Sequence, residues 1–297
     1  MNATRKDTID DRVYTLYDEY CHGFIDRRQF FERVAALSVA GISALAMADA
    51  LLPDYAQAQT ISFTDERIKA NYVGYPSPGG NSGKMRGYLV KPDGDGPFPA
   101  VLVIHENRGL NPYIEDVARR AAVEGFLALA PDGLFPIGGY PGNDDDGREM
   151  QASLDREKLL KDMVNGAYFL KSHALSTGRL GATGFCWGGT ATNQLAVILG
   201  SDLDAAAPFY GTAPASEGVV RIKAAMLIHY AEDDPRVNAT RADYEAALKA
   251  AGVSFEMFTY PGTRHGFHNN STPRYDAEAA ELAWQRTMAL FHTHLES

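Results

Sequence analysis

The chain has 297 residues, with 28 lysines and arginines against 38 aspartates and glutamates, and a formal net charge of −10. This length fits one sizeable domain. The acidic balance argues against nucleic acid and anionic membrane surfaces as partners.

The amino-terminal segment has the pattern of an export signal. Arg27 and Arg28 precede a mildly apolar segment at residues 34–47, and an Ala-Gln-Ala cleavage signature follows at residues 56–58. These features resemble a twin-arginine signal with cleavage after Ala58. They predict a periplasmic or secreted protein.

Cleavage there would divide the chain into a leader, residues 1–58, and a folded domain, residues 59–297. Cys21 would leave with the leader, so the mature chain would keep one cysteine and could form no internal disulfide. Asp49 interrupts the apolar segment, and stable membrane insertion is therefore not expected. The alternative is a cytoplasmic protein that keeps this segment, with residues 27–50 as an amphipathic helix on a neighbouring subunit of a homo-oligomer.

After the leader, the chain alternates segments with strand-like and helix-like apolar patterns. This alternation predicts an α/β fold, in which a mainly parallel sheet is covered by helices on both faces. Such sheets bind ligands at the carboxyl ends of their strands. The predicted strands are residues 84–90, 100–104, 125–130, 179–185, 205–210, 224–230 and 253–260, and the predicted helices are residues 113–124, 155–172, 190–199, 238–251 and 275–295.

A glycine- and aspartate-rich loop at residues 135–147 is expected to cover the cleft and to set specificity. Its acidic run, residues 144–146, lacks the alternate spacing of Ca²⁺ ligands, so a solvated loop is the favoured interpretation. The sequence predicts neither a bound metal nor a cofactor.

The most informative motif is Gly-Phe-Cys-Trp-Gly-Gly at residues 184–189, at a predicted strand-to-helix junction. Glycine two residues before and after a nucleophile is the elbow of α/β-hydrolases, where side chains at Gly184 or Gly188 would crowd the turn. Cys186 is therefore the predicted nucleophile. The competing interpretation is a small buried cysteine in a glycine-rich turn.

An elbow nucleophile needs an acid and a histidine, in that chain order. Asp234 follows the predicted strand at residues 224–230 and is the preferred acid, with Asp233 as its competitor. His265 follows the last predicted strand and is the preferred base, with His268 as the second candidate. In this triad the histidine accepts the thiol proton and the aspartate orients the histidine.

The oxyanion of an acyl intermediate needs two donors. The backbone N–H of Trp187, directly after the nucleophile, is one candidate, and that of Asn107, after the strand at residues 100–104, is the other. Glu106 lies beside Asn107 and would sit near the elbow; a solvated loop acid is the alternative interpretation.

Together these motifs resemble the dienelactone hydrolases, a family of α/β-hydrolases. The resemblance implies an α/β-hydrolase fold, a Cys186-Asp234-His265 triad, and a role for Glu106 in keeping the cysteine a neutral thiol until substrate arrives. Such a role makes chemical sense because a permanent thiolate is readily oxidised, whereas a neutral thiol is not. The matching segments are His-Glu-Asn-Arg-Gly at 105–109, Pro-Asp-Gly-Leu at 131–134, the elbow at 184–189, the Asp234 loop and His-Gly-Phe at 265–267.

Relatives that act on dienelactone hold its carboxylate with arginines, one of them shortly after the histidine. Here no arginine follows His265 until Arg274. The sequence offers other candidates for contacting the substrate, namely Arg108, Tyr140, Tyr210, Arg264 and His268.

The predicted function is a cysteine-dependent hydrolase of small esters or lactones, with an acyl-enzyme intermediate and a small molecule as its partner. The alternatives are a thiol-redox protein and a catalytically silent protein of the same fold. The lack of a C-x-x-C motif argues against the redox alternative.

Overall fold

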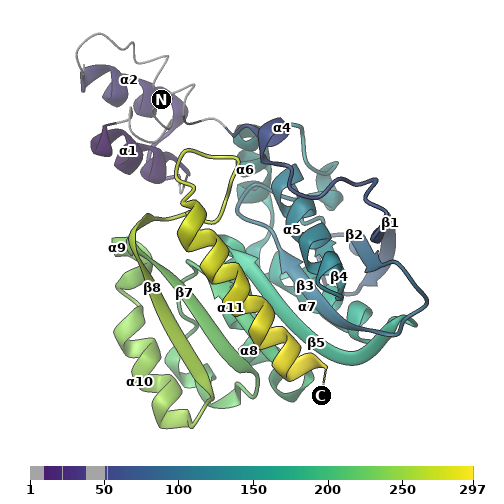
Figure 1. The fold of residues 1–297 in the computed structure, drawn as a ribbon. Helices are drawn as coiled ribbons and strands as arrows, with labels where there is room; N and C mark the ends of the chain where they lie inside the picture. The colour runs from purple at the N-terminus through teal and green to yellow at the C-terminus, as the bar shows by residue number, and fades with distance from the viewer. Residues whose placement is uncertain (1–9, 22, 38–50, 52, 297) are drawn as a thin grey trace.

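The computed structural model describes residues 10–21, 23–37, 51 and 53–296 (Figure 1). Its body is an eight-stranded sheet with the order β1-β2-β4-β3-β5-β6-β7-β8. Strand β2 pairs antiparallel with β1 and β4, and the other pairs are parallel. The strands are β1 (Ile68–Ser77), β2 (Gly83–Pro92), β3 (Phe98–Ile104), β4 (Leu127–Pro131), β5 (Ser176–Phe185), β6 (Ala205–Phe209), β7 (Ala225–Asp233) and β8 (Phe255–Arg264).

Helices cover both faces of this sheet. On one face α5 (Pro112–Val123) and α11 (Ala277–Leu295) share a hydrophobic cluster with the strands, and Figure 1 shows both helices in front of the sheet. On the other face α7 (Arg156–Lys171), α8 (Trp187–Leu199) and α10 (Arg241–Ala251) form the second cluster. The predicted α/β class and its parallel sheet are confirmed.

The central strands are apolar because both of their sides are covered. Five residues of β3, Ala100 to Ile104, are wholly buried, and every residue of β4 is buried. Continuous apolar runs of this kind are typical of parallel strands packed between two helical layers.

Several local signals act as the sequence predicts. Asn111 caps α5 by accepting from the Ile114 N–H, and Pro112 occupies the first turn. Gly252 ends α10 with φ of 65°, a backbone conformation that glycine adopts readily.

The predicted loop at 135–147 is partly helical instead. Its acidic residues begin α6 (Asp144–Ser153), which Asn143 caps through the Asp146 N–H. Carboxylates in a first helical turn are favoured by the helix dipole. Asp144 is also buried against Arg108, so the prediction of a solvated acidic loop is wrong for this residue.

Two further elements differ from the prediction. The helix predicted at residues 238–251 begins at Arg241, as α10, and a separate short helix, α9 (Pro235–Asn238), precedes it; β1 was not predicted. The remaining short elements are α4 (Tyr55–Ala58), η2 (Phe135–Ile137), η3 (Gly200–Asp202) and η4 (Ser216–Arg221).

The amino-terminal residues form a helical hairpin, α1 (Asp11–Cys21) and α2 (Arg27–Ala36), which lies beyond the carboxyl edge of the sheet (Figure 1). Asp26 begins α2 with a capping box to Gln29. The hairpin has a small apolar core of its own, which includes Val13, Tyr17, Phe30 and Val34.

Most of the apolar segment predicted at residues 34–47, and Asp49, lie outside the described residues. Among the helices that the structure describes, none combines the length and apolar character needed to cross a bilayer.

Candidate active site

The cysteine of the elbow occupies a strained position between β5 and α8. Cys186 has φ of 57° and ψ of −113°, in a region of backbone space that residues with a Cβ rarely occupy. A Cβ on Gly184 would collide with the backbone of Gly188, and a Cβ on Gly188 would collide with the carbonyl oxygen of Ile104. The two glycines therefore let the turn lie against itself and against β3.

A buried histidine and aspartate face this turn from the ends of two other strands. Asp234 follows β7 and His265 follows β8, and the His265 Nδ1–H donates to Asp234 Oδ2 at 2.6 Å. Asp233 points elsewhere, because its carboxylate is exposed and pairs with Arg264 at 3.2 Å. Of the two candidate acids, Asp234 is the one that meets the histidine.

His265 lies between Asp234 and the cysteine. Burial opposes a charge on its ring, but the Asp234 carboxylate, the Cys186 sulfur and hydrogen bonds to both outweigh burial and raise the pKa of His265 to about 9. An imidazolium in this position is stabilised from both sides. The same arrangement could take a proton from the thiol and return it to a leaving group.

Glu106 is buried near Cys186 rather than solvated. Only 3% of it is exposed, and one carboxylate oxygen accepts from the Asn269 side-chain amide at 3.0 Å. Burial raises the pKa of Glu106, the nearby Arg108 opposes this, and the Cys186 sulfur adds to it. The carboxyl group and the thiol therefore influence each other's charge.

The loop that carries Glu106 is held by His105, a residue whose role the sequence did not indicate. The Gly133 N–H donates to His105 Nε2 at 3.2 Å, which leaves Nδ1 to donate to the Glu106 carbonyl oxygen at 2.6 Å. The His105 ring also stacks on Trp187, with the ring centroids 5.5 Å apart. This arrangement ties the loop after β3 to the first residue of α8.

The cysteine opens into a cavity of about 380 Å³. Trp187 and Asn107, the two candidate oxyanion donors, both line it. The Trp187 N–H is among the first four of α8, which have no partner within the helix. The other lining residues are Cys21, Gly23, Arg148, Glu149, Gln151, Ala152, Arg156, Leu159, Thr190, Thr212 and Arg236.

Two predicted substrate-contacting residues lie next to this cavity, around a buried carboxylate. Arg108 forms an ion pair with Asp144 at 2.6 Å, and the Tyr140 hydroxyl donates to the same carboxylate at 2.8 Å. Both residues line a second cavity of about 290 Å³. Arg148 and Cys21 line both cavities, so the two spaces adjoin.

The other three predicted residues are placed differently. Tyr210 packs behind His265, with ring centroids 4.9 Å apart. Arg264 pairs with Asp233 and stacks on Tyr14, on the outer side of His265. The positions of Arg264 and His268 do not support the predicted contact with substrate.

His268 belongs to the packing beneath the site. Its Nδ1 is 2.7 Å from the Tyr113 hydroxyl oxygen, and burial holds its pKa well below the usual range. A neutral ring fits this position, because aromatic side chains surround it. The second candidate base thus packs on Phe185 and bonds Tyr113, whereas the carboxylate of Asp234 is bonded by His265.

Sequence reasoning missed several residues of the site. Thr190 lies one turn after Cys186 on α8 and could have been found from helical spacing. Asn269 and the hairpin residues carry no local signal, because tertiary contacts alone bring them here. Among the described residues, no group of three or more His, Cys, Asp or Glu side chains could hold a metal ion.

The elbow at Cys186, the sheet, and the buried pair of Asp234 and His265 together define a hydrolase of the α/β-hydrolase fold. The family model "Dienelactone hydrolase family" matches residues 85–295. The chain belongs to the dienelactone hydrolase family and is a hydrolase that acts on ester or lactone bonds. A second family model, "YqhI-like", matches residues 1–38.

Relatives agree with this assignment. The chain is 62% identical over 115 residues to "Putative hydrolase fragment YghX" of Escherichia coli K12, covering 38% of this chain and 97% of that protein. It is 32% identical over 243 residues to "Putative carboxymethylenebutenolidase" of the same organism, covering 76% of this chain and 88% of that protein. A solved structure described as a "Putative Dienelactone Hydrolase" from Klebsiella pneumoniae aligns with a TM-score of 0.65 at 29% identity, covering 75% of this chain and all of that one.

Proposed function

We propose that Cys186 is the nucleophile of a cysteine-dependent hydrolase of small esters or lactones. The observation that carries this proposal is the His265–Asp234 hydrogen bond of 2.6 Å, together with the Cys186 sulfur, which lies close enough to His265 to help raise the pKa of its ring. A nucleophile, a base and an orienting acid in series are the minimum for nucleophilic acyl transfer.

In the proposed reaction, His265 accepts the thiol proton and the Cys186 sulfur attacks the acyl carbon. The resulting oxyanion is bound by the backbone N–H groups of Trp187 and Asn107. The imidazolium then protonates the leaving alkoxide or enolate oxygen as the C–O bond breaks, which leaves a thioester. Water, deprotonated by His265, attacks this acyl-enzyme and releases the carboxylic acid and the thiol.

Glu106 has a proposed role in the resting enzyme. Its buried carboxyl group lies close enough to Cys186 for the two charges to disfavour each other. A carboxylate in this position disfavours a thiolate and so limits oxidation of the resting cysteine. Substrate binding would then relieve this inhibition.

The proposed substrate is a small ester or lactone, and an anionic group on it would suit the cavity. Arg148, Arg156 and Arg236 all line the space into which Cys186 opens. Guanidinium groups recognise carboxylates with paired hydrogen bonds. Relatives named as carboxymethylenebutenolidases support trying dienelactone as a test substrate.

The thiol-redox alternative gains one observation from the structure. Cys21 is buried and lines the same cavity as Cys186, so a second thiol is present near the nucleophile. A Cys21→Ser variant separates the two functions. Ester turnover by the wild type that Cys21→Ser leaves unchanged supports the hydrolase. Absence of ester turnover in both proteins, together with a peroxide-dependent thiol oxidation that Cys21→Ser abolishes, supports the redox alternative.

The decisive experiment compares hydrolysis of p-nitrophenyl acetate and dienelactone by the wild type and by Cys186→Ala. We expect turnover that disappears in the variant. The ratio between the two substrates tests the requirement for a carboxylate. Turnover that survives the substitution would exclude Cys186 as the nucleophile.

Localisation is a separate proposal with two opposed forms. Export with cleavage after Ala58 would remove the hairpin, whereas a cytoplasmic protein would keep it. Contacts around the cleavage position support retention, since the Asn270 amide donates to the Ala58 carbonyl oxygen at 2.7 Å and the Tyr55 hydroxyl donates to Asp144 at 2.6 Å.

A further inference from the structure

The carboxyl end of α1 reaches the cavity of the nucleophile. Cys21, the last residue of α1, and Gly23, just beyond it, line the same space as Cys186 and Trp187. Cys21 is buried, with 5% of its surface exposed. Part of the cavity wall therefore comes from a segment outside residues 85–295, to which the hydrolase family model corresponds.

The final carbonyl groups of α1 are bound by donors of the main domain. The Asn107 side-chain amide donates to the Cys21 carbonyl oxygen at 2.6 Å, and the Arg148 guanidinium donates to the Tyr20 carbonyl oxygen at 2.9 Å. The last carbonyls of a helix have no intrahelical partner and carry the negative end of its dipole. The Arg148 guanidinium and the Asn107 amide, which line the cavity, therefore bind two of these carbonyl groups.

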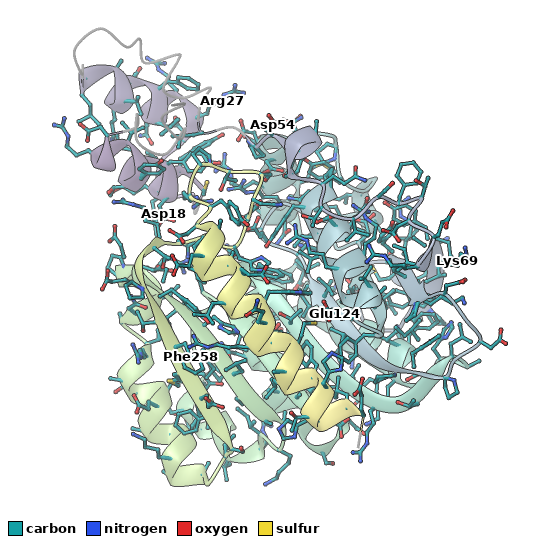
Figure 2. The ribbon with its side chains drawn as sticks, in the orientation of Figure 1. Asp18, Arg27, Asp54, Lys69, Glu124 and Phe258 are labelled. Atoms are coloured by element: carbon teal, nitrogen blue, oxygen red, sulfur yellow. The ribbon has the colours of Figure 1, made fainter. Side chains whose placement is uncertain are left out.

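Side chains of α1 also pair with cationic groups of the main domain. Three tyrosines of α1 each lie against a different guanidinium of the main domain, at 4.2 to 5.0 Å from ring centroid to guanidinium carbon. Asp18 adds a carboxylate 3.8 Å from Arg274, and Figure 2 shows it on the side of α1 that faces the main domain. The three pairs are Tyr14 with Arg264, Tyr17 with Arg274, and Tyr20 with Arg148.

The thiol of Cys21 is held as well. The Arg108 guanidinium donates to Cys21 Sγ at 2.8 Å while it pairs with Asp144. Four arginines from separate parts of the main domain thus converge on one helical face of about three turns. Contacts of this number and direction fix the end of α1 over the nucleophile.

We propose that the hairpin of α1 and α2 is a wall of the substrate cavity and limits the size of molecules that reach Cys186. The proposal concerns access to the thiol. The interpretation that this wall selects substrates by size rests on the proposed hydrolase function. Weakening the contacts of α1 opens the cavity, and bulky molecules then gain more access than small ones.

The test measures alkylation of Cys186 in the full chain by iodoacetamide and by N-(1-pyrenyl)maleimide, followed on the Cys186 peptide by mass spectrometry. The ratio of the two rates isolates access, because the same thiolate attacks both reagents. Asp18→Lys places a cation opposite Arg274, and Tyr14→Leu removes the ring under Arg264 but keeps an apolar side chain in the hairpin core. Glu32→Lys is the matched control, since it makes the same charge change on the exposed side of α2.

We expect Asp18→Lys and Tyr14→Leu each to raise the bulky-to-small rate ratio about fivefold, which corresponds to the loss of about 1 kcal/mol of docking free energy. Glu32→Lys should leave the ratio unchanged. An unchanged ratio in both hairpin variants, or an equal rise in the control, would overturn the proposal.

The same variants give a second readout if the protein hydrolyses esters. The value of kcat/KM for p-nitrophenyl octanoate relative to the acetate should rise with the alkylation ratio. Absence of all ester turnover alongside a shifted alkylation ratio would refute the proposed hydrolase mechanism and leave the wall standing. Ester turnover with an unchanged alkylation ratio would refute the wall and leave the proposed hydrolase mechanism standing.

Discussion

Replacing Asp234 by Asn should remove the main support of a charged His265 ring, the proposed base. In the wild type the pKa of His265 is raised from 6.5 to about 9 although burial alone would lower it, and the Asp234 carboxylate is the largest favourable cause. A rise of this size corresponds to about 3 kcal/mol of preference for the charged ring. Because the imidazolium forms as the thiol is deprotonated, losing most of this preference should lower kcat/KM roughly a hundredfold.

The pH dependence has a definite sign. The pKa of His265 in the folded wild type lies above its value of 6.5, so this group stabilises the fold fully below pH 6.5, and the contribution disappears as pH rises through about 9. Asp234→Asn should lack this contribution. The stability difference between the two proteins should therefore be largest near pH 6 and shrink toward pH 9.

The assay combines kcat/KM for p-nitrophenyl acetate from pH 5 to 10 with denaturant unfolding at both ends of that range. In the variant, the alkaline limb of the rate profile should move below its position near pH 9, because the leaving group needs a protonated His265. Asp233→Asn is the control, since Asp233 is exposed and pairs with Arg264. Equal losses in the two variants would show that the hydrogen bond between Asp234 and His265 does not carry the effect.

Three other predictions follow from the site and the leader. Glu106→Gln should speed alkylation of Cys186 by iodoacetamide near neutral pH, because it removes the charge that disfavours the thiolate; identical rates across pH would exclude Glu106 from the mechanism. Gly188→Ala should lower the free energy of unfolding by about 2 kcal/mol, measured by urea denaturation, because its Cβ would meet the backbone of β3; wild-type stability would contradict the close approach. If the protein is exported, changing Arg27 and Arg28 to Lys should abolish a periplasmic form in cell fractionation, whereas a full-length cytoplasmic protein in both strains would refute export.

Much of the geometry of the candidate site was predictable because its signals are local. The spacing of glycines around Cys186 follows from the steric demands of a tight turn, and the structure places the cysteine in that strained backbone conformation. The parallel sheet was predictable from buried apolar runs alternating with helical periodicity. The carboxyl ends of the strands then brought Asp234 and His265 to the same edge.

Contacts between residues distant in sequence could not be predicted. Asn269 meets Glu106 across 163 positions, and the sequence, which preferred Asp234 to Asp233, did not reveal that Asp233 pairs with Arg264. The burial of Asp144 also depends on a contact between distant residues. Composition alone predicts that a run of aspartates is solvated, whereas Asp144 is buried because it pairs with Arg108.

The sequence by itself determined the class of the fold, the elbow and the chain order of the proposed nucleophile, acid and base, because steric limits and periodicity operate over a few residues. Only the tertiary structure decided what surrounds Cys186. The end of α1 lies over the cavity because four arginines from three segments of the main domain converge on a face of tyrosines, Cys21 and the last carbonyl groups of the helix. That convergence exists only once the sheet has brought the loops together, so the pattern of residues in any one segment does not reveal it.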